Sequence, residues 1–172
     1  VNATVPDASL GTYNGTLSIS DFTGAHTLSV PFTVSVRGMS SVFTWDWSTA
    51  GVGTNIIDGL TLSNTGTKPV TLTNMILRKW WQCDSNHATL DQIELNGNII
   101  FSGSVDDGES ANITDTTIPV LTSYTNNSLV FSAPINDEGE VFVADVNFSD
   151  GTSYTSGALG SGCGSDTTPP SQ

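Results

Sequence analysis

The residues with the most reactive side chains lie in one short segment, Cys83-Asp84-Ser85-Asn86-His87. A thiolate, a carboxylate and an imidazole at this spacing are ligand types for a transition metal, or a Cys/His pair for nucleophilic catalysis. The alternative, which we favour, is a half-cystine followed by a polar loop, because a fourth metal ligand is missing. The only other cysteine is Cys163, so we predict a disulfide between Cys83 and Cys163.

Histidine is the side chain that titrates near neutral pH, and the chain has two. His26 lies in the turn Thr23-Gly24-Ala25-His26, where a lone histidine is usually hydrated. Neither a Gly-x-Ser-x-Gly nor a His-Glu-x-x-His motif occurs in the sequence. Serine and aspartate are so frequent that spacing alone identifies no Ser-His-Asp triad. Without an assembled acid, base and nucleophile, we expect that the protein is not an enzyme.

Two acidic turns gather oxygen ligands of the kind that calcium prefers. One turn contains Asp106, Asp107 and Glu109, and the other contains Asp137 and Glu138. Neither has the spacing of an EF-hand loop, and acidic residues in turns more often serve only to solvate a hairpin. We therefore expect no cofactor, and these five residues are the predicted ligands if calcium does bind.

The four tryptophans are the candidates for a sugar-binding platform. Trp45 and Trp47 are two residues apart, so in a strand both indoles lie on one face, where they could stack on the rings of surface glycans. We favour the alternative that both belong to the core, as large aromatic side chains usually do. Trp80 and Trp81 are adjacent and point to opposite faces of a strand, so one of them is either exposed or covered by another segment or subunit.

The charge balance limits the partners that this protein can bind. The chain has 17 acidic residues and 4 Lys or Arg, which gives a formal net charge of −13. Phosphate backbones and anionic membranes are bound through Lys and Arg, so we expect no nucleic acid and no membrane surface as a partner. No apolar run approaches the ~18 residues of a spanning helix, so we also expect no membrane insertion. Residues 1–4 lack a signal-peptide pattern, which predicts a mature, soluble chain.

Five Asn-x-Ser/Thr sequons point to an exported protein. Glycan acceptors are useful on an exported surface, and disulfides persist in oxidising compartments outside the cytoplasm. We therefore predict an extracellular or cell-surface location. The candidate N-glycosylation sites are Asn2, Asn14, Asn112, Asn126 and Asn147.

Alternation of apolar and polar residues dominates the sequence and predicts half-buried β-strands. Leu17 and Ile19, followed by Leu28 to Val36, place apolar side chains on one face, and Pro31 marks the second run as an edge strand or a bulged one. No segment has the apolar spacing of a helix. We predict an all-β fold, an antiparallel β-sandwich of the Ig-like or jelly-roll type with about ten strands and almost no helix. Further strands are predicted at residues 41–47, 55–63, 70–81, 90–95, 98–101, 110–114, 128–132, 140–148 and 152–155.

Turn residues divide these strands. Asn96-Gly97 and Asp150-Gly151 have the chemistry of tight hairpin turns, since both residue types adopt left-handed conformations. The segment Asn64-Thr65-Gly66-Thr67-Lys68-Pro69 predicts a third hairpin.

The predicted sandwich domain covers residues 14–156 and has two different ends. Residues 1–13 are an N-terminal extension in which Val1, Ala3 and Val5 alternate with polar residues. Residues 157–172 form a Gly, Ser, Thr and Pro-rich tail. The predicted disulfide would tether this tail beside the Trp80-Trp81 strand.

The stretch 55–155 carries a resemblance to known surface proteins. It contains Ile56-Ile57-Asp58-Gly59-Leu60-Thr61-Leu62-Ser63-Asn64-Thr65-Gly66, then Pro69-Val70-Thr71-Leu72, and later Val146-Asn147-Phe148-Ser149-Asp150-Gly151-Thr152. This pattern resembles the Ig-like or jelly-roll ectodomains of archaeal and bacterial surface proteins. Among these are pilin- and archaellin-associated domains and filament subunits of the archaeal thread and TasA-like kinds. The resemblance covers a little over half the chain. Pilins and archaellins also carry a long apolar N-terminal helix, whereas this chain begins with a polar, sequon-bearing strand.

The resemblance to thread-type and TasA-like filaments implies donor-strand complementation, in which the N-terminal strand of one subunit completes the sheet of the next. Val1, Ala3 and Val5 are then the donor residues, and copies of the chain are the partners. We therefore expect a structural subunit of an extracellular filament, pilus or cell-surface assembly that polymerises head to tail. The alternatives are an intramolecular or frayed N-terminal strand, and an adhesion or carbohydrate-binding module that uses the tryptophans.

Overall fold

The computed structural model describes residues 10–80, 87–135 and 140–160 of the chain. It divides into two compact units, Val1–Gly38 and Met39–Gln172. The fifteen strands pair antiparallel, and the one helical element among the described residues is the single 3-10 turn η1 (Met39–Ser41). The predicted all-β class with almost no helix is confirmed, although the strands are more numerous than expected.

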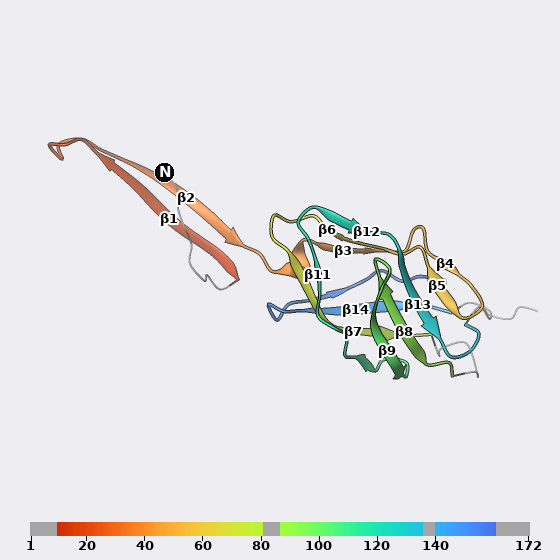
Figure 1. Cartoon of the computed structure of the whole chain (residues 1–172). Coiled ribbons are helices and arrows are strands. Elements are labelled where there is room, and N and C mark those ends of the chain that lie inside the picture. The colour runs from red at the N-terminus through yellow and green to blue at the C-terminus, as the bar shows by residue number, and fades with distance from the viewer. Residues whose placement is uncertain (1–9, 81–86, 136–139, 161–172) are drawn as a thin grey trace, which may run out of the picture. The chain divides into compact units, whose positions relative to one another are not determined.

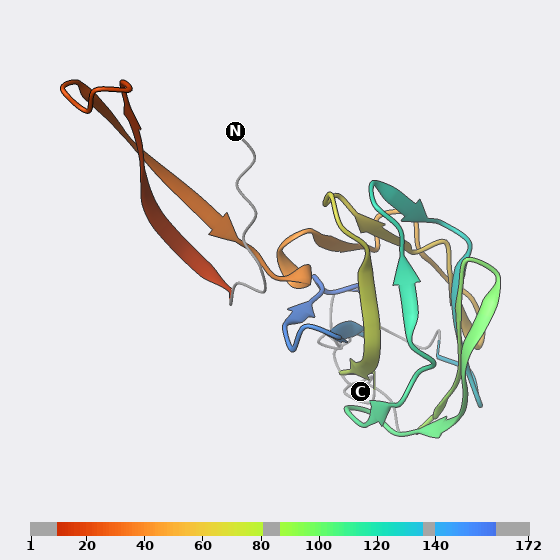
Figure 2. The same cartoon turned by 60° about the vertical axis from the view of Figure 1, so that its left-hand side comes forward.

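The described part of the first unit is a β-hairpin, which we call the arm (residues 10–36). Its strands β1 (Gly11–Ser20) and β2 (Thr27–Val36) pair along their whole length with no shift of register. Figures 1 and 2 show the arm as a long two-stranded ribbon. β2 is therefore an edge strand without a bulge, which is the first of the two alternatives that Pro31 left open.

The structure divides the chain at a different place from the sequence-based boundary. The expected boundary between residues 13 and 14 falls inside β1, whereas the division of the structure follows Gly38. The reason is strand pairing, since β1 and β2 form a two-stranded sheet that is separate from the sheets of the second unit. Residues 14–36, which the alternation assigned to the sandwich, belong to the arm.

The second unit is a β-sandwich. In one sheet β7 (Val70–Arg78) pairs with β14 (Val143–Phe148) on one side and with β10 (Ser110–Ala111) and β11 (Thr116–Ile118) on the other, and β15 (Ser153–Thr155) follows β14. Facing it are a three-stranded sheet, in the order β12-β6-β3, and a five-stranded sheet, in the order β4-β5-β13-β8-β9. Their bounds are β3 Phe43–Asp46, β4 Gly51–Val52, β5 Ile56–Asp58, β6 Thr61–Asn64, β8 Leu90–Leu95, β9 Asn98–Val105, β12 Thr122–Tyr124 and β13 Asn127–Phe131.

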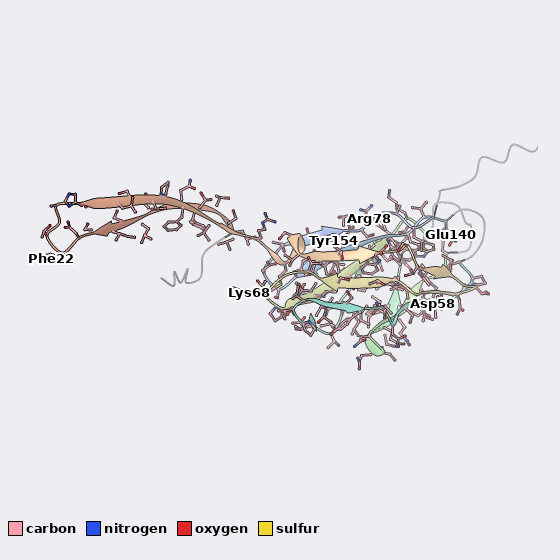
Figure 3. The ribbon with its side chains drawn as sticks, turned by 90° about the horizontal axis from the view of Figure 1, so that it is seen from above. Phe22, Asp58, Lys68, Arg78, Glu140 and Tyr154 are labelled. Carbon is pink, nitrogen blue, oxygen red and sulfur yellow. The ribbon has the colours of Figure 1, made fainter. Side chains whose placement is uncertain are left out.

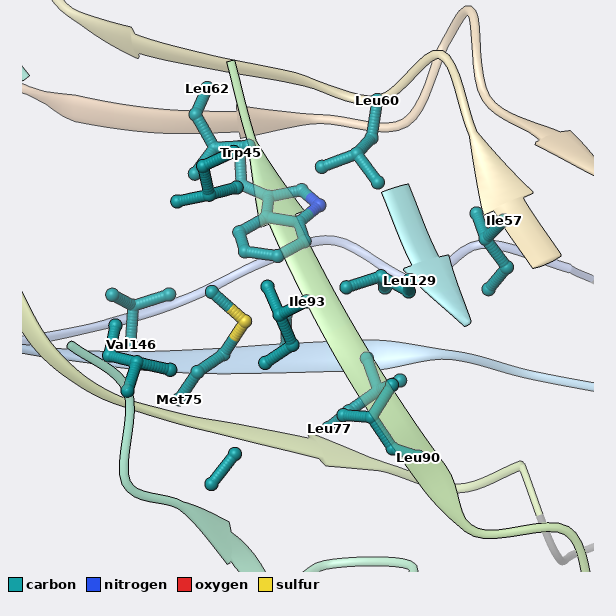
Figure 4. Packing of buried hydrophobic residues seen from close by; sticks show 14 of the residues in the cluster. Trp45, Ile57, Leu60, Leu62, Met75, Leu77, Leu90, Ile93, Leu129 and Val146 are labelled. Atoms are coloured by element: carbon teal, nitrogen blue, oxygen red, sulfur yellow. The ribbon is translucent and has the colours of Figure 1, made fainter. Parts of the chain in front are cut away.

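The apolar core lies between these sheets. Met75 of β7, Ile93 of β8 and Leu129 of β13 are each fully buried and point into the same interior (Figure 4). At one side of the core the Phe43 ring of β3 meets Phe148 of β14 edge to face, with 5.1 Å between the ring centroids. Every member of the buried cluster comes from the second unit, so the core of the sandwich contains no residue of the arm.

Two of the three predicted hairpin turns are confirmed. Asn96 and Gly97 have φ angles of 51° and 78°, as a tight turn between β8 and β9 requires. Gly151 has a φ of 80°, and its amide donates to the Phe148 carbonyl in the turn between β14 and β15.

The third turn prediction was wrong, because residues 64–69 connect two different sheets. β6 pairs with β3 and β12, whereas β7 pairs with β10, β11 and β14. The Asn64 side chain stabilises this crossover. Its Oδ1 accepts from the Gly66 amide (2.8 Å). Its Nδ2 donates to the carbonyls of Lys68 (2.8 Å), Ile118 (3.1 Å) and Pro119 (3.0 Å). This one buried side-chain amide thus binds both the connection from β6 to β7 and the connection from β11 to β12, each of which passes from one sheet to another.

The beginning of the predicted tail is part of the sandwich. Phe142 and Leu159 exchange two backbone hydrogen bonds of 2.9 Å, and the indole Nε1 of Trp47 donates to the Gly157 carbonyl at 2.8 Å. Residues 157–159 of the predicted tail thus belong to the sandwich, and the residues after 160 lie outside the described part of the chain.

Candidate functional site

The described tryptophans do not form a sugar-binding surface. Trp45, Trp47 and Trp80 are only 4%, 8% and 1% exposed, and the Trp80 indole donates to the Ala88 carbonyl at 2.9 Å. The core interpretation of Trp45 and Trp47 is therefore correct, and the stacking hypothesis fails for these three residues because their faces are covered. β7 ends at Arg78, and Lys79 has a φ of 80°, so strand alternation does not extend to the Trp pair. Trp81 lies outside the described residues.

Several predicted sites fall wholly or partly outside the described residues. These are the disulfide between Cys83 and Cys163, the donor residues Val1, Ala3 and Val5, the sequon residue Asn2, and the acidic pair Asp137 and Glu138. All of them stay predictions.

The acidic turn between β9 and β10 uses its carboxylates to bind backbone amides, one just after the end of β7 and one in the turn itself. Asp107 Oδ1 accepts from the Lys79 amide at 2.5 Å, and Glu109 Oε2 accepts from the Asp106 amide at 3.1 Å. Within residues 10–80, 87–135 and 140–160, no three His, Cys, Asp or Glu side chains are grouped so that they could hold a metal ion. These two carboxylates thus serve backbone amides, and the calcium site at this turn stays a prediction.

The sequon asparagines that the structure describes are accessible to a glycan. Asn14, Asn112, Asn126 and Asn147 are all exposed. Asn14 lies on β1, opposite Thr33, and its Oδ1 accepts a hydrogen bond from the Thr33 hydroxyl at 2.9 Å. Because this pair lies on the polar side of the arm, a glycan on Asn14 would leave the other side of the arm free.

That other side of the arm carries six of the twelve large apolar side chains that are exposed among the described residues. The register places Leu17 opposite Val30 and Ile19 opposite Leu28, and the Phe32 ring lies over Gly15, where a β-carbon would collide with it. We call this surface the apolar face of the arm. Its members are Tyr13, Leu17, Ile19, Leu28, Val30, Phe32, Val34 and Val36. The opposite side carries Thr12, Asn14, Thr16, Ser18, Ser20, Thr27, Ser29, Pro31, Thr33 and Ser35.

The two edges of the arm differ. The Asp21 amide donates to the His26 carbonyl (3.1 Å), so these two residues are a hydrogen-bonded pair. In an antiparallel ladder, hydrogen-bonded and non-hydrogen-bonded pairs alternate, so Thr16 and Pro31 are a non-hydrogen-bonded pair. Pro31 therefore costs the arm no internal hydrogen bond, and its missing N–H falls on the outer edge of β2. The outer edge of β2 is thus a poor template for another strand.

The tip of the arm is fastened by Asp21. Its Oδ1 accepts from the amides of Thr23 and Ala25 at 3.1 Å and from the Thr23 hydroxyl at 2.7 Å, and its Oδ2 lies 2.9 Å from His26 Nδ1. The hydrogen bonds from Thr23 and His26 lower the pKa of Asp21 from 3.8 to about 2. This fastening is therefore fully present above pH 3.8 and is lost as the pH falls through about 2. Phe22, at the tip, is fully exposed (Figure 3).

No protein-family model matches this chain, and no curated protein is similar to it in sequence. In the described ranges, the structure contains no helix with the length and apolar character needed to cross a membrane.

Sequence reasoning identified both strands of the arm but not the surface that they form. Alternation showed that Leu17, Ile19 and the run from Leu28 to Val36 each have an apolar side. Alternation alone predicts that such a side faces the core of a sandwich, because alternation does not say what covers the apolar side. The register reveals a separate surface, because each of Leu28, Val30, Phe32, Val34 and Val36 on β2 lies opposite an apolar residue or a glycine of β1.

Proposed function

We propose that this protein is a structural, non-enzymatic subunit of an extracellular filament or cell-surface assembly, and that it joins copies of itself through its N-terminal part. The observation that carries this proposal is the exposed apolar face of the arm. Leu28, Ile19 and Phe32 are 61%, 53% and 44% exposed, and they lie on one continuous side. Contiguous apolar surfaces of this kind on a secreted protein mark sites of association.

The distribution of charge supports association through the arm. The unit Val1–Gly38 contains two acids, Asp7 and Asp21, and one cation, Arg37, so its formal charge is −1. The remaining −12 of the total −13 belongs to the unit Met39–Gln172. Two sandwich units therefore repel each other, whereas the arm can approach another molecule with little electrostatic cost.

The extracellular location rests on the sequons, and the exposure of four of their asparagines is what glycosylation requires. The predicted donor strand of Val1, Ala3 and Val5 remains part of the proposal as a second point of contact. One symmetric contact yields only a dimer, so an extended assembly needs a second contact of this kind. The competing carbohydrate-binding function has no comparable support, because the described tryptophans are buried.

Sedimentation velocity of the whole chain and of a variant that starts at Met39 tests this proposal. The variant keeps the entire described core, so it should fold. We expect the whole chain to form species larger than a monomer as its concentration rises, and the variant to stay monomeric. A whole chain that stays monomeric at every concentration, or a variant that associates equally well, would overturn the proposal.

A further inference from the structure

The apolar face of the arm is a large exposed surface on a two-stranded hairpin. Its six large side chains that are 37% to 61% exposed present on the order of 600 Å², which equals the largest apolar patches of typical monomers. These six residues are Tyr13, Leu17, Ile19, Leu28, Val30 and Phe32. A two-stranded hairpin without a packed face is only marginally stable in water. The arm therefore needs a partner that covers this face.

The described part of the sandwich offers no surface that matches it. The large apolar side chains that are exposed there are Val52 on β4, Ile99 on β9, and Val120 and Leu121 in the turn between β11 and β12. They come from three different strands or turns, and only two of them are adjacent in the chain. The core residues of the described sandwich are at most 8% exposed, so they are not available to cover the arm.

Addition of a strand to an edge of the arm would not bury its apolar face. A strand that pairs with β1 or β2 extends the two-stranded sheet sideways and satisfies backbone groups, but it leaves the apolar face in water. The missing N–H of Pro31 also weakens the outer edge of β2 as a template. The surface that needs a partner is a face, and a face is covered by another face.

A second arm provides the matching face. It has the same length, the same apolar side chains and a unit charge of only −1. Two arms packed face to face would remove on the order of 1,200 Å² from water, which reaches the lower end of specific protein interfaces. Their hydroxyl-rich sides, with the exposed Asn14, would then point outward on both copies.

We infer that the apolar face of β1 and β2 packs against the same face of the arm of a second copy, so that four strands form a small two-layered sandwich. This inference rests on the proposed self-assembly and names its contact. It differs from a head-to-tail contact, in which the arm of one copy would dock on the sandwich of another.

A capture experiment separates these two arrangements. Tagged chain that starts at Leu10 keeps the arm but lacks the predicted donor residues Val1, Ala3 and Val5. It is mixed with untagged chain that starts at Met39, and in parallel with untagged chain that also starts at Leu10, at a concentration at which the whole chain associates. If arms pair with arms, the tagged protein captures the untagged chain that has the arm and does not capture the variant that lacks it.

Each other outcome has a definite meaning. If the variant without the arm is captured as well as the chain with the arm is, the arm docks on the sandwich, so the arm-to-arm contact is wrong while self-assembly stands. If the tagged protein captures neither chain, the arm-to-arm contact is wrong, and if the whole chain also stays monomeric in sedimentation velocity, the proposed function is wrong as well.

Discussion

Replacement of Val30 by aspartate weakens self-association of the whole chain by about 100-fold or more, because it places an unpaired carboxylate at the centre of the buried contact between arms. Val30 lies opposite Leu17 in the middle of the apolar face and is 43% exposed in the single copy. The free arm can therefore hydrate the new carboxylate. The paired arms cannot hydrate it without losing apolar contacts.

Ser29→Asp is the matched control for this variant. Ser29 is the neighbour of Val30 on β2, lies opposite Ser18 and is exposed on the polar side, so the same charge is added to the same strand. We expect its dissociation constant to stay within a few-fold of that of the unaltered chain in sedimentation equilibrium, since surface charges contribute little. Equal weakening by both substitutions would show that charge, and not the apolar face, controls association.

Replacement of Asn64 by alanine destabilises the sandwich by about 3 kcal/mol, because it leaves buried backbone groups without partners. Asn64 is 1% exposed, and its side chain serves the Gly66 amide and the carbonyls of Lys68, Ile118 and Pro119. For a domain of this size the loss corresponds to a decrease in Tm of about 10 °C.

The control for this substitution is Asn98→Ala, which removes an exposed amide whose hydrogen bond is to the nearby Asn96 carbonyl at 3.2 Å. Substitutions at such surface positions usually change stability by no more than about 0.5 kcal/mol. Thermal unfolding followed by circular dichroism measures both variants. Similar Tm values for the two would mean that the Asn64 crossover contributes little to stability.

The strands of the sandwich could be predicted because their residues obey local rules. Alternation in the runs 70–78 and 143–148 and the turn residues Asn96 and Gly97 specify strands and turns without reference to the rest of the chain. The crossover at Asn64 could not be predicted in this way. The same residue types form a hairpin or a crossover, and here the outcome depends on carbonyls at residues 118 and 119, more than fifty residues away in sequence.

The same limit explains the interpretation of the arm. The sequence shows that β1 and β2 each have one apolar side, but the number of neighbouring strands and the surface that covers that side are tertiary properties. Burial of Trp45 and Trp47, in contrast, could be predicted from the sequence. It follows from the general preference of large aromatic side chains for cores and does not depend on which residues they contact.

Hydrogen exchange of the whole chain at two concentrations, one below and one above the onset of association, tests the central claim most directly. An isolated hairpin opens readily, whereas a hairpin whose face is packed exchanges its amides slowly. If copies join through the arm, protection of the β1 and β2 amides increases with concentration, while protection of the β7 and β14 amides stays constant. Association with no change in the protection of the arm amides would contradict the claim.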